Sequence, residues 1–219
     1  MLNFPAEVHE HIGTVMARMH RLTENLGLAR ATYTPAVLLE EPFERLARFL
    51  DPETEEMRFM ADAKKYLLRE LAGADTRQLR RGAVHMDIWF DNLNVHGDRV
   101  TLFNFDFCGN GWLCTDIAYY LLQLHATEKD ETERDLKAAR FMKGYESVTP
   151  VSAEEKRLLP MLGVGMYFFY LGVQCSRYDD WSNQFLNTVY LKRFIMLLVK
   201  KYYDHHGLGT GNDRPGGTV

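Results

Sequence analysis

His85, Asp87 and Asn92 form the pattern H-x-D-x-x-x-x-N, and a second polar cluster follows at Asn104 and Asp106. Transfer of a phosphoryl group to a hydroxyl needs a carboxylate that orients the acceptor and takes its proton. It also needs oxygen ligands that hold Mg²⁺ against the nucleotide phosphates. These residue types can supply both parts, so this stretch is the first candidate for a catalytic site.

A predicted β-hairpin lies between the two clusters. Residues 93–95 and 100–105 are short β-like runs joined by His96-Gly97-Asp98-Arg99, which is a hairpin signal. Antiparallel pairing about this turn sets position i opposite roughly 195 or 196 minus i, so Asn92 should face residue 103 or 104. The short loop back from Asn92 keeps Asp87 nearby. The spacing therefore predicts that Asp87, Asn92, Asn104 and Asp106 converge at one end of the hairpin.

The stretch resembles the aminoglycoside phosphotransferase and choline kinase-like superfamily. That superfamily shows H-G-D-x-x-x-x-N, a hairpin, I-D-[FW]-x-x-[AC]-G and a downstream D-[IL]-A. The resemblance implies that Asp87 is the catalytic base and that Asn92 holds Mg²⁺ and so contributes to ATP binding. It also implies that His85 supports the loop, and that Asp116, in Asp116-Ile117-Ala118, braces the loop from the following helix.

The sequence departs from the family pattern at the metal site. Asn104 occupies the place of the family's metal-binding aspartate, although Mg²⁺ prefers a carboxylate to a neutral amide oxygen. Asp106 lies two residues further along the predicted strand and should share a face with Asn104, because side chains alternate along a strand. The expected metal ligands are thus Asn92 with Asn104 or Asp106.

A second departure concerns the nucleotide-covering lobe. No Gly-rich loop between strands and no lysine within a β-branched strand precedes His85, and residues 16–23 (MARMHRLT) resemble the family's helix after the interlobe hinge. The expected fold is therefore α+β and mainly helical, a protein kinase-like C-terminal lobe with a small hairpin at its active site and no β-rich N-terminal lobe. We expect this domain over 1–206, with catalytic loop 84–95 and metal-site segment 103–109, and a Gly-rich disordered tail over 207–219.

By resemblance, the function expected is ATP- and Mg²⁺-dependent transfer of the γ-phosphate to a hydroxyl of a small molecule of the aminoglycoside, choline or homoserine type. The alternative is a pseudoenzyme or truncated remnant that binds a ligand or a partner, suggested by Asn104 and by the expected lack of a lobe. Loss of that lobe would bare an apolar surface and favour self-association.

Composition narrows the classes of partner. A net charge of −4 and a pI near 6.1 argue against nucleic acid as a partner, because no basic excess is present to neutralise phosphates.

The sequence also predicts a cytoplasmic protein. Cys108, Cys114 and Cys175 form no CxxC pair, which is typical of reduced cytoplasmic thiols, and no leader pattern is found at the start. Residues 158–176 are uncharged but contain Pro160 and three glycines, so we expect a buried core helix and no membrane partner.

Helical periodicity covers most of the remaining sequence. Ser152 with Glu155 forms a predicted capping box, Thr115 or Asp116 is a predicted N-cap, and Gly27 and Gly73 are expected to end helices. The expected helices are 6–27, 42–50, 53–72, 116–126, 130–146, 152–176 and 185–204.

Two other arrangements remain open from the residues alone. His85, Asp87, His96 and Asp106 could form a metallohydrolase site, although His96 sits at the far end of the hairpin. Aromatic residues could also surround a quaternary ammonium acceptor by cation–π contact. These are Trp112, Tyr119, Tyr178 and Trp181.

Overall fold

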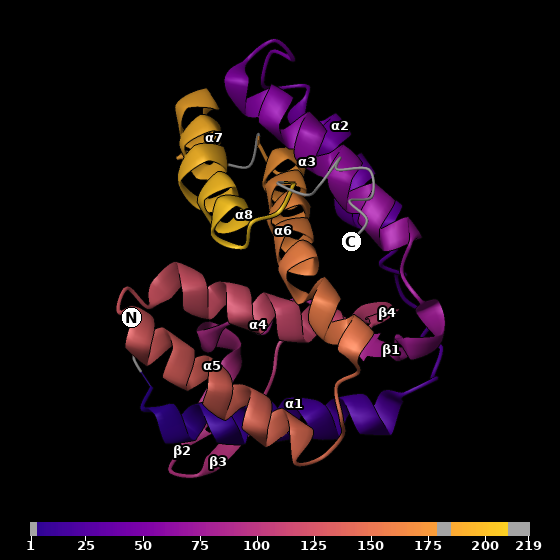
Figure 1. The fold of residues 1–219 in the computed structure, drawn as a ribbon, viewed down its shortest axis with the longest axis vertical. Helices are drawn as coiled ribbons and strands as arrows, with labels where there is room; N and C mark the ends of the chain where they lie inside the picture. The colour runs from indigo at the N-terminus through magenta and orange to yellow at the C-terminus, as the bar shows by residue number, and fades with distance from the viewer. Residues whose placement is uncertain (1–3, 179–184, 210–219) are drawn as a thin grey trace, which may run out of the picture.

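The computed structural model describes residues 4–178 and 185–209 and is mainly helical, as expected. Its strands all lie between residues 81 and 112, in the middle of the described part of the chain (Figure 1). The helices before them are α1 (Ala6–Thr23), the π-helix η1 (Ala36–Glu40), α2 (Glu41–Leu46), α3 (Glu55–Ala72) and the short 3-10 helix η2 (Thr76–Gln78). Those after them are α4 (Cys114–Thr127), α5 (Glu131–Glu146), α6 (Ala153–Ser176), α7 (Thr188–Phe194), the π-helix η5 (Ile195–Lys200) and α8 (Lys201–His205).

The helices form two groups that α6 connects. Helices α1, α4 and α5 lie together at the bottom of Figure 1, whereas α2, α3, α7 and α8 surround the upper part of α6. Glycines allow α1 and α5 to touch along their backbones, because a Cβ at Gly144 would collide with the carbonyl of Glu10 and one at Gly13 with that of Phe141. The lower group is therefore a tightly packed base for the strands.

Two separate antiparallel pairs make up the strands. The predicted hairpin consists of β2 (Leu93–His96) and β3 (Arg99–Leu102), which pair from Leu93↔Leu102 to His96↔Arg99. Gly97, with φ of 61°, takes the left-handed conformation that the turn requires. The second pair, β1 (Arg81–Val84) with β4 (Gly109–Trp112), was not predicted. Because β1 precedes the catalytic loop and β4 follows the segment with Asn104 and Asp106, their pairing holds both ends of this stretch together.

Several predicted helix ends are confirmed and others are wrong. The capping box of Ser152 and Glu155 is formed, and Gly73 ends α3. Helix α1 ends at Thr23 instead of Gly27, and α4 begins at Cys114, ahead of the predicted caps Thr115 and Asp116. Asp116 does not cap α4, because its carboxylate accepts hydrogen bonds from the catalytic loop. The helix predicted over 185–204 is divided into α7, η5 and α8.

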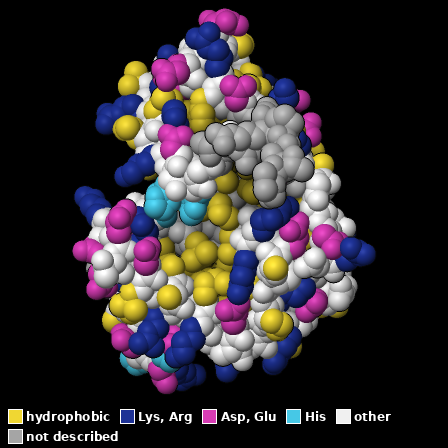
Figure 2. All heavy atoms as spheres, in the orientation of Figure 1, with side chains coloured by type: hydrophobic (Ala, Val, Ile, Leu, Met, Phe, Trp, Pro, Cys, Tyr) yellow, Lys and Arg dark blue, Asp and Glu magenta, His cyan; other side chains and the backbone are white. Residues whose placement is uncertain are grey.

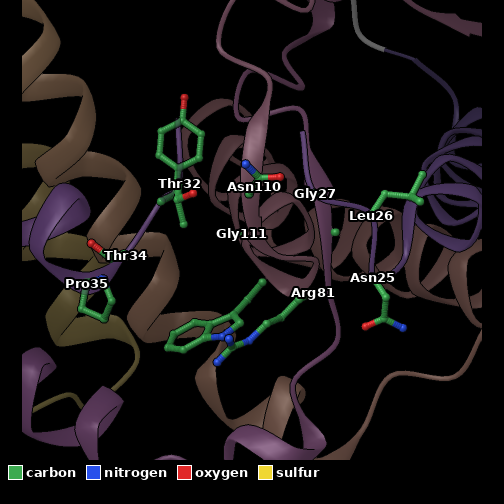
Figure 3. A pocket seen from close by; sticks show the side chains of 12 residues that line it. Asn25, Leu26, Gly27, Thr32, Thr34, Pro35, Arg81, Asn110 and Gly111 are labelled. Carbon is green, nitrogen blue, oxygen red and sulfur yellow. The ribbon is translucent and has the colours of Figure 1, made fainter. Parts of the chain in front are cut away.

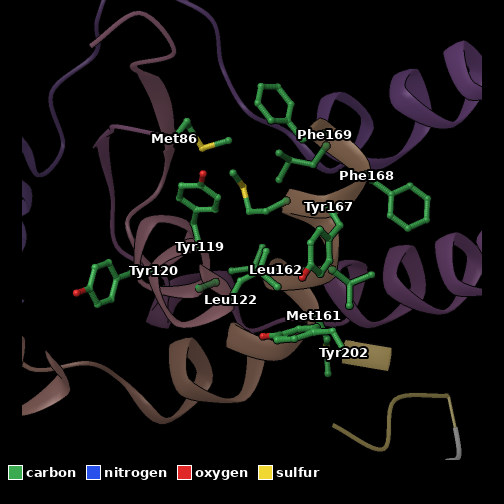
Figure 4. Close-up of a cluster of buried hydrophobic side chains, with 14 of the residues drawn as sticks. Met86, Tyr119, Tyr120, Leu122, Met161, Leu162, Tyr167, Phe168, Phe169 and Tyr202 are labelled. Carbon is green, nitrogen blue, oxygen red and sulfur yellow. The ribbon is translucent and has the colours of Figure 1, made fainter. Parts of the chain in front are cut away.

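Helix α6 is the core helix that its composition predicted. It is long and apolar enough to cross a membrane by those measures alone, but 72% of its most apolar window is buried inside the protein. Side chains of α4 and α6 meet in this core, among them Tyr119, Leu122 and Leu162, whereas Phe168 is buried on the side of α6 that points away from α4 (Figure 4). Of the predicted tail, only 207–209 are described, and Leu208 is buried there; the rest lies outside the described residues.

Two histidines of the lower group, His9 in α1 and His125 in α4, take part in the packing. Figure 2 shows apolar side chains gathered in a hollow between the two groups, with histidines at its edge. A cavity of about 260 Å³ between α4, α5, α6 and α8 is lined in part by His125. His9 is buried in α1, where its Nδ1 lies 2.8 Å from the Tyr120 hydroxyl. Burial lowers the pKa of both His9 and His125 to about 4.

These lowered values predict that acid destabilises the fold. Each ring has a pKa near 6.5 in the unfolded chain and a lower one in the folded chain, so the unfolded state binds more protons between pH 6.5 and 4 and stability falls with pH there. For fully buried His9 the loss from pH 7 to 5 is roughly 2 kcal/mol; half-exposed His125 contributes less because solvent screens it. Urea unfolding at the two pH values should show a smaller loss for His9→Gln than for the control His11→Gln on the same helix. Equal losses in both variants would contradict the assignment to His9.

Candidate active site

The first turn of α4 holds the catalytic loop through the buried carboxylate of Asp116. Its Oδ2 accepts from the backbone N–H of His85 at 2.7 Å and its Oδ1 from that of Met86 at 2.8 Å. The Nε2 atom of His20, from α1, donates to Oδ2 at 3.0 Å, and the His20 ring and Asp116 are both fully buried. Met86 has φ of 65°, a left-handed conformation that is costly for a residue with a side chain. Asp116 therefore holds the backbone of a strained loop through two hydrogen bonds.

His85 connects the catalytic loop to the second polar cluster. Its Nδ1 accepts from the N–H of Asp87 at 3.3 Å, so Nε2 carries the proton and donates to the carbonyl of Phe103 at 3.0 Å. The ring is fully buried and packs against Phe105, with centroids 4.7 Å apart. Both ring nitrogens are thus used to fix backbone positions. This geometry supports the loop and leaves His85 no free nitrogen for proton transfer.

Three of the four predicted polar residues meet at the end of the hairpin. Asn92 donates through Nδ2 to both the carbonyl oxygen and the Oδ2 of Asp87, each at 2.8 Å. Asn104 donates through Nδ2 to the Oδ1 of Asn92 at 3.0 Å. Their approach follows from the register, since the Phe103 N–H donates to the Asn92 carbonyl just beyond the last strand pair. The pairing predicted from the turn is therefore confirmed, since Asn92 faces Phe103.

Asp106 was expected to join this network, but it does not. Strand β3 ends at Leu102, and Asn104 has a left-handed φ of 61°, so the backbone is not extended between Asn104 and Asp106. The alternation of side chains that placed both residues on one face applies only to extended backbone, so that reasoning was wrong. Asp106 lies in an exposed turn, and the guanidinium of Arg30 donates to its backbone carbonyl at 2.9 Å.

Two tyrosines contact the Asp87 carboxylate: Tyr170, which the sequence analysis did not consider, and Tyr119, which it considered only for an aromatic box. The hydroxyl of Tyr170, from α6, donates to Oδ1 at 2.6 Å, and that of Tyr119, from α4, donates to the same oxygen at 3.4 Å. The rings stack, with centroids 5.4 Å apart and planes 21° apart, and Figure 4 shows Tyr119 pointing toward Met86. Burial, followed for Tyr170 by the neighbouring Tyr119 and Asp87, raises the pKa of both phenols well above the usual value. Both therefore remain protonated donors.

The aromatic box suggested for an ammonium group is not assembled as one cluster. Tyr119 stacks on Tyr170, whereas Tyr178 stacks on Phe49 with centroids 4.2 Å apart. Trp112 lines a different cavity, and Trp181 lies outside the described residues. For the metallohydrolase arrangement, no group of three or more His, Cys, Asp or Glu is placed to hold a metal within 4–178 and 185–209. His96 pairs with Arg99 beside the hairpin turn, at the opposite end from Asn92.

A cavity of about 530 Å³ lies beside β1 and β4 (Figure 3). It is lined by the segment after α1, including Asn25 and Gly27, and by Arg81 and Asn110 from the strands. Asn110 holds this segment in place, accepting from the N–H of Leu28 at 2.8 Å and donating to its carbonyl at 3.1 Å. None of the polar residues around Asp87 lines this cavity, so it is separate from the candidate active site.

Comparison with known proteins is consistent with this geometry. The model of the phosphotransferase enzyme family matches residues 3–151. A homoserine kinase of Sinorhizobium medicae is 33% identical over 175 residues, which cover 78% of this chain and 50% of that protein. One from Afipia carboxidovorans is 27% identical over 203 residues, covering 91% and 59%. The chain thus spans about half the length of the curated relatives it matches.

Solved structures share the fold. A microcompartment-associated aminopropanol kinase has a TM-score of 0.70 at 18% identity, covering 95% of this chain and 66% of that one. An amicoumacin kinase has a TM-score of 0.68 at 18% identity, covering 91% and 59%. The family match, over residues 3–151, includes the loop, hairpin and α4 that assemble the polar network around Asp87. The chain belongs to the phosphotransferase enzyme family.

Proposed function

We propose that this chain carries the acceptor-side catalytic machinery of an ATP-dependent phosphotransferase that phosphorylates a hydroxyl of a small amino alcohol. The observation that supports this most is the Asp87 carboxylate, held by Asn92 and Tyr170 at the end of the hairpin. A fixed carboxylate of this kind can orient an acceptor hydroxyl and take its proton as the phosphoryl group is transferred. In this proposal Asp87 is the catalytic base, with His85 and Asp116 supporting its loop.

The acceptor class rests on the relatives. The similar proteins are named as kinases of homoserine and of aminopropanol, and a further neighbour in fold belongs to a choline/ethanolamine kinase family. These four compounds are all small molecules with a hydroxyl and a nitrogen-bearing group. We extend that class to this chain, and leave the individual acceptor to the assay below.

ATP and Mg²⁺ are the proposed cosubstrate and metal. The oxygens of Asn92 and Asn104 and the exposed carboxylate of Asp106 fit Mg²⁺ in chemical kind, because this ion takes oxygen ligands and keeps several waters. The Oδ1 of Asn92 now accepts from the Nδ2 of Asn104 at 3.0 Å, so a metal bound there would replace this hydrogen bond. When bound, Mg²⁺ would neutralise charge on the transferred phosphate. The amicoumacin kinase was solved with AMP-PNP and Ca²⁺, a nucleotide analogue with a divalent cation.

The proposal predicts ATP-dependent formation of a phosphate monoester. The purified chain would be incubated with ATP, MgCl₂ and either homoserine, 1-amino-2-propanol, ethanolamine or choline, and the products followed by ³¹P NMR. We expect a new monoester signal with at least one of these acceptors. We expect none with 2-aminobutyrate, which is homoserine without its hydroxyl, and none when EDTA replaces MgCl₂.

Two results would contradict the proposal. A folded chain that binds ATP with Mg²⁺ but forms no ester would instead support a ligand-binding module. A phosphoramidate or acyl phosphate formed with 2-aminobutyrate as the sole acceptor would show that an amine or a carboxylate, and not a hydroxyl, is the nucleophile. Circular dichroism on the same sample establishes that the chain is folded.

A further inference from the structure

The carboxylate of Asp87 has an unusual set of hydrogen-bond donors. Asn92 occupies Oδ2, on the side of the expected metal ligands, and Tyr170 donates to Oδ1 at 2.6 Å, a short contact typical of a hydroxyl bound to a charged acceptor. Each carboxylate oxygen can accept about two hydrogen bonds. Donors on both oxygens therefore stop the carboxylate from rotating and leave few directions from which an acceptor hydroxyl can approach.

Tyr170 is well placed to impose this restraint. Its ring stacks on Tyr119 and packs edge-on against Phe169, and its hydroxyl is also 2.9 Å from the carbonyl of Met86. The helix that carries it is anchored nearby, because Gly172 packs directly against Pro42. The single phenolic proton is thus shared between the carboxylate of Asp87 and the strained peptide that precedes it. Both the side chain and the backbone of the catalytic loop are fixed to α6.

We propose that Tyr170 is a positioning residue that orients the Asp87 carboxylate toward the acceptor hydroxyl. This inference rests on the proposed function, in which Asp87 is the base. Tyr170 itself exchanges no proton with the substrate, because it remains a phenol. With Tyr170 and Tyr119 both donating to Oδ1, its role is to hold the carboxylate so that the remaining acceptor site, on Oδ2, faces the acceptor hydroxyl. A positioning role should appear in the rate of transfer more than in acceptor binding.

The test compares Tyr170→Phe with Tyr167→Phe, a matched substitution on the same helix. The Tyr167 ring packs against Phe194 and Tyr202 instead of the catalytic loop, with centroids 5.6 and 6.0 Å apart. Tyr170→Phe keeps the ring stack and removes only the hydroxyl. We expect kcat to fall about tenfold or more, as for loss of a hydrogen bond to a charged group, with the acceptor KM changed by less than about threefold. Tyr167→Phe should leave both constants near wild type.

A second measurement does not depend on turnover. In protein labelled with ¹³C at the aspartate carboxyls, the Asp87 signal, assigned with Asp87→Asn, should shift or broaden in Tyr170→Phe and stay unchanged in Tyr167→Phe. If the wild-type chain transfers no phosphate, the proposed function fails, and this signal still decides whether Tyr170 orients the carboxylate.

Three outcomes would overturn the inference. An unchanged Asp87 signal in Tyr170→Phe would show that the hydroxyl does not fix the carboxylate. A lower acceptor KM with unchanged kcat would show that Tyr170 competes with the acceptor for Asp87. Equal losses of kcat in Tyr170→Phe and Tyr167→Phe would show that the loss comes from altered packing of α6 and not from the hydrogen bond to Asp87.

Discussion

Replacing Asp87 with asparagine is expected to lower phosphoryl transfer by about 10²- to 10⁴-fold, the range found when a general base is removed. Asparagine has nearly the same shape and can still accept from Tyr170, but it carries no charge and cannot take the acceptor proton. The partly exposed side chain contributes less to stability than to the reaction, so we expect the free energy of unfolding to change by about 1 kcal/mol. Initial rates with the best acceptor and urea unfolding measure the two effects.

The chain offers a matched control for this variant. Asp91 lies four residues further along the same loop, is exposed, and accepts from Nε1 of Trp89 at 3.0 Å. Asp91→Asn makes the same change in charge close to the site and should leave the rate within about threefold. If Asp87→Asn retained more than a tenth of the wild-type rate, or if both variants lost activity equally, Asp87 would not be the base.

The core of this site could be predicted because it is local in sequence. Asp87, Asn92 and Asn104 lie within 18 residues, and a hairpin turn with Gly97 at a left-handed φ sets the pairing between them. Once the turn is located, the register follows from geometry, and the side chains at its open end must approach each other. The hydrogen bonds from Asn104 to Asn92 and from Asn92 to Asp87 are the result.

The expected position of Asp106 was wrong for an equally local reason. Phenylalanines at 103, 105 and 107 alternate with polar residues and imitate a half-buried strand. The backbone turns at Asn104 instead, and Phe103 and Phe105 are 44% and 41% exposed. Periodicity shows which side chains could share a face, but it does not show where the pairing of a strand ends.

Other parts of the site depend on contacts between distant segments. Strand β4 reads Gly-Asn-Gly-Trp, which has almost no strand propensity, and it pairs with β1 because the chain on both sides is already fixed. Tyr170 lies 83 residues from Asp87, inside the uncharged part of α6 that runs from residue 158 to 176. No periodicity distinguishes its hydroxyl from those of the other tyrosines in the core. The role of such a residue can be recognised only once the packing of the helices is known.

Removing the Asp116 side chain should cause the largest loss of stability, about 3–5 kcal/mol for Asp116→Ala, the range for breaking a buried charged contact. The substitution leaves the N–H groups of His85 and Met86 buried without an acceptor, and it releases the ring of His20. The left-handed conformation of Met86 also loses the hydrogen bond that holds it. Urea unfolding followed by fluorescence measures the change in free energy.

Asp130→Ala is the control, because it also removes a carboxylate that accepts a backbone hydrogen bond near a helix start. Asp130 accepts from the N–H of Glu133 at 3.1 Å as the exposed N-cap of α5, so its loss should cost only about 1 kcal/mol. The difference between the losses of unfolding free energy in the two variants therefore measures what the burial of Asp116 and its hold on the strained loop contribute beyond ordinary helix capping. Similar losses in both would mean that the catalytic loop holds its conformation without Asp116. In that case the loop would depend chiefly on the hydrogen bonds that His85, Asn92 and Tyr170 make.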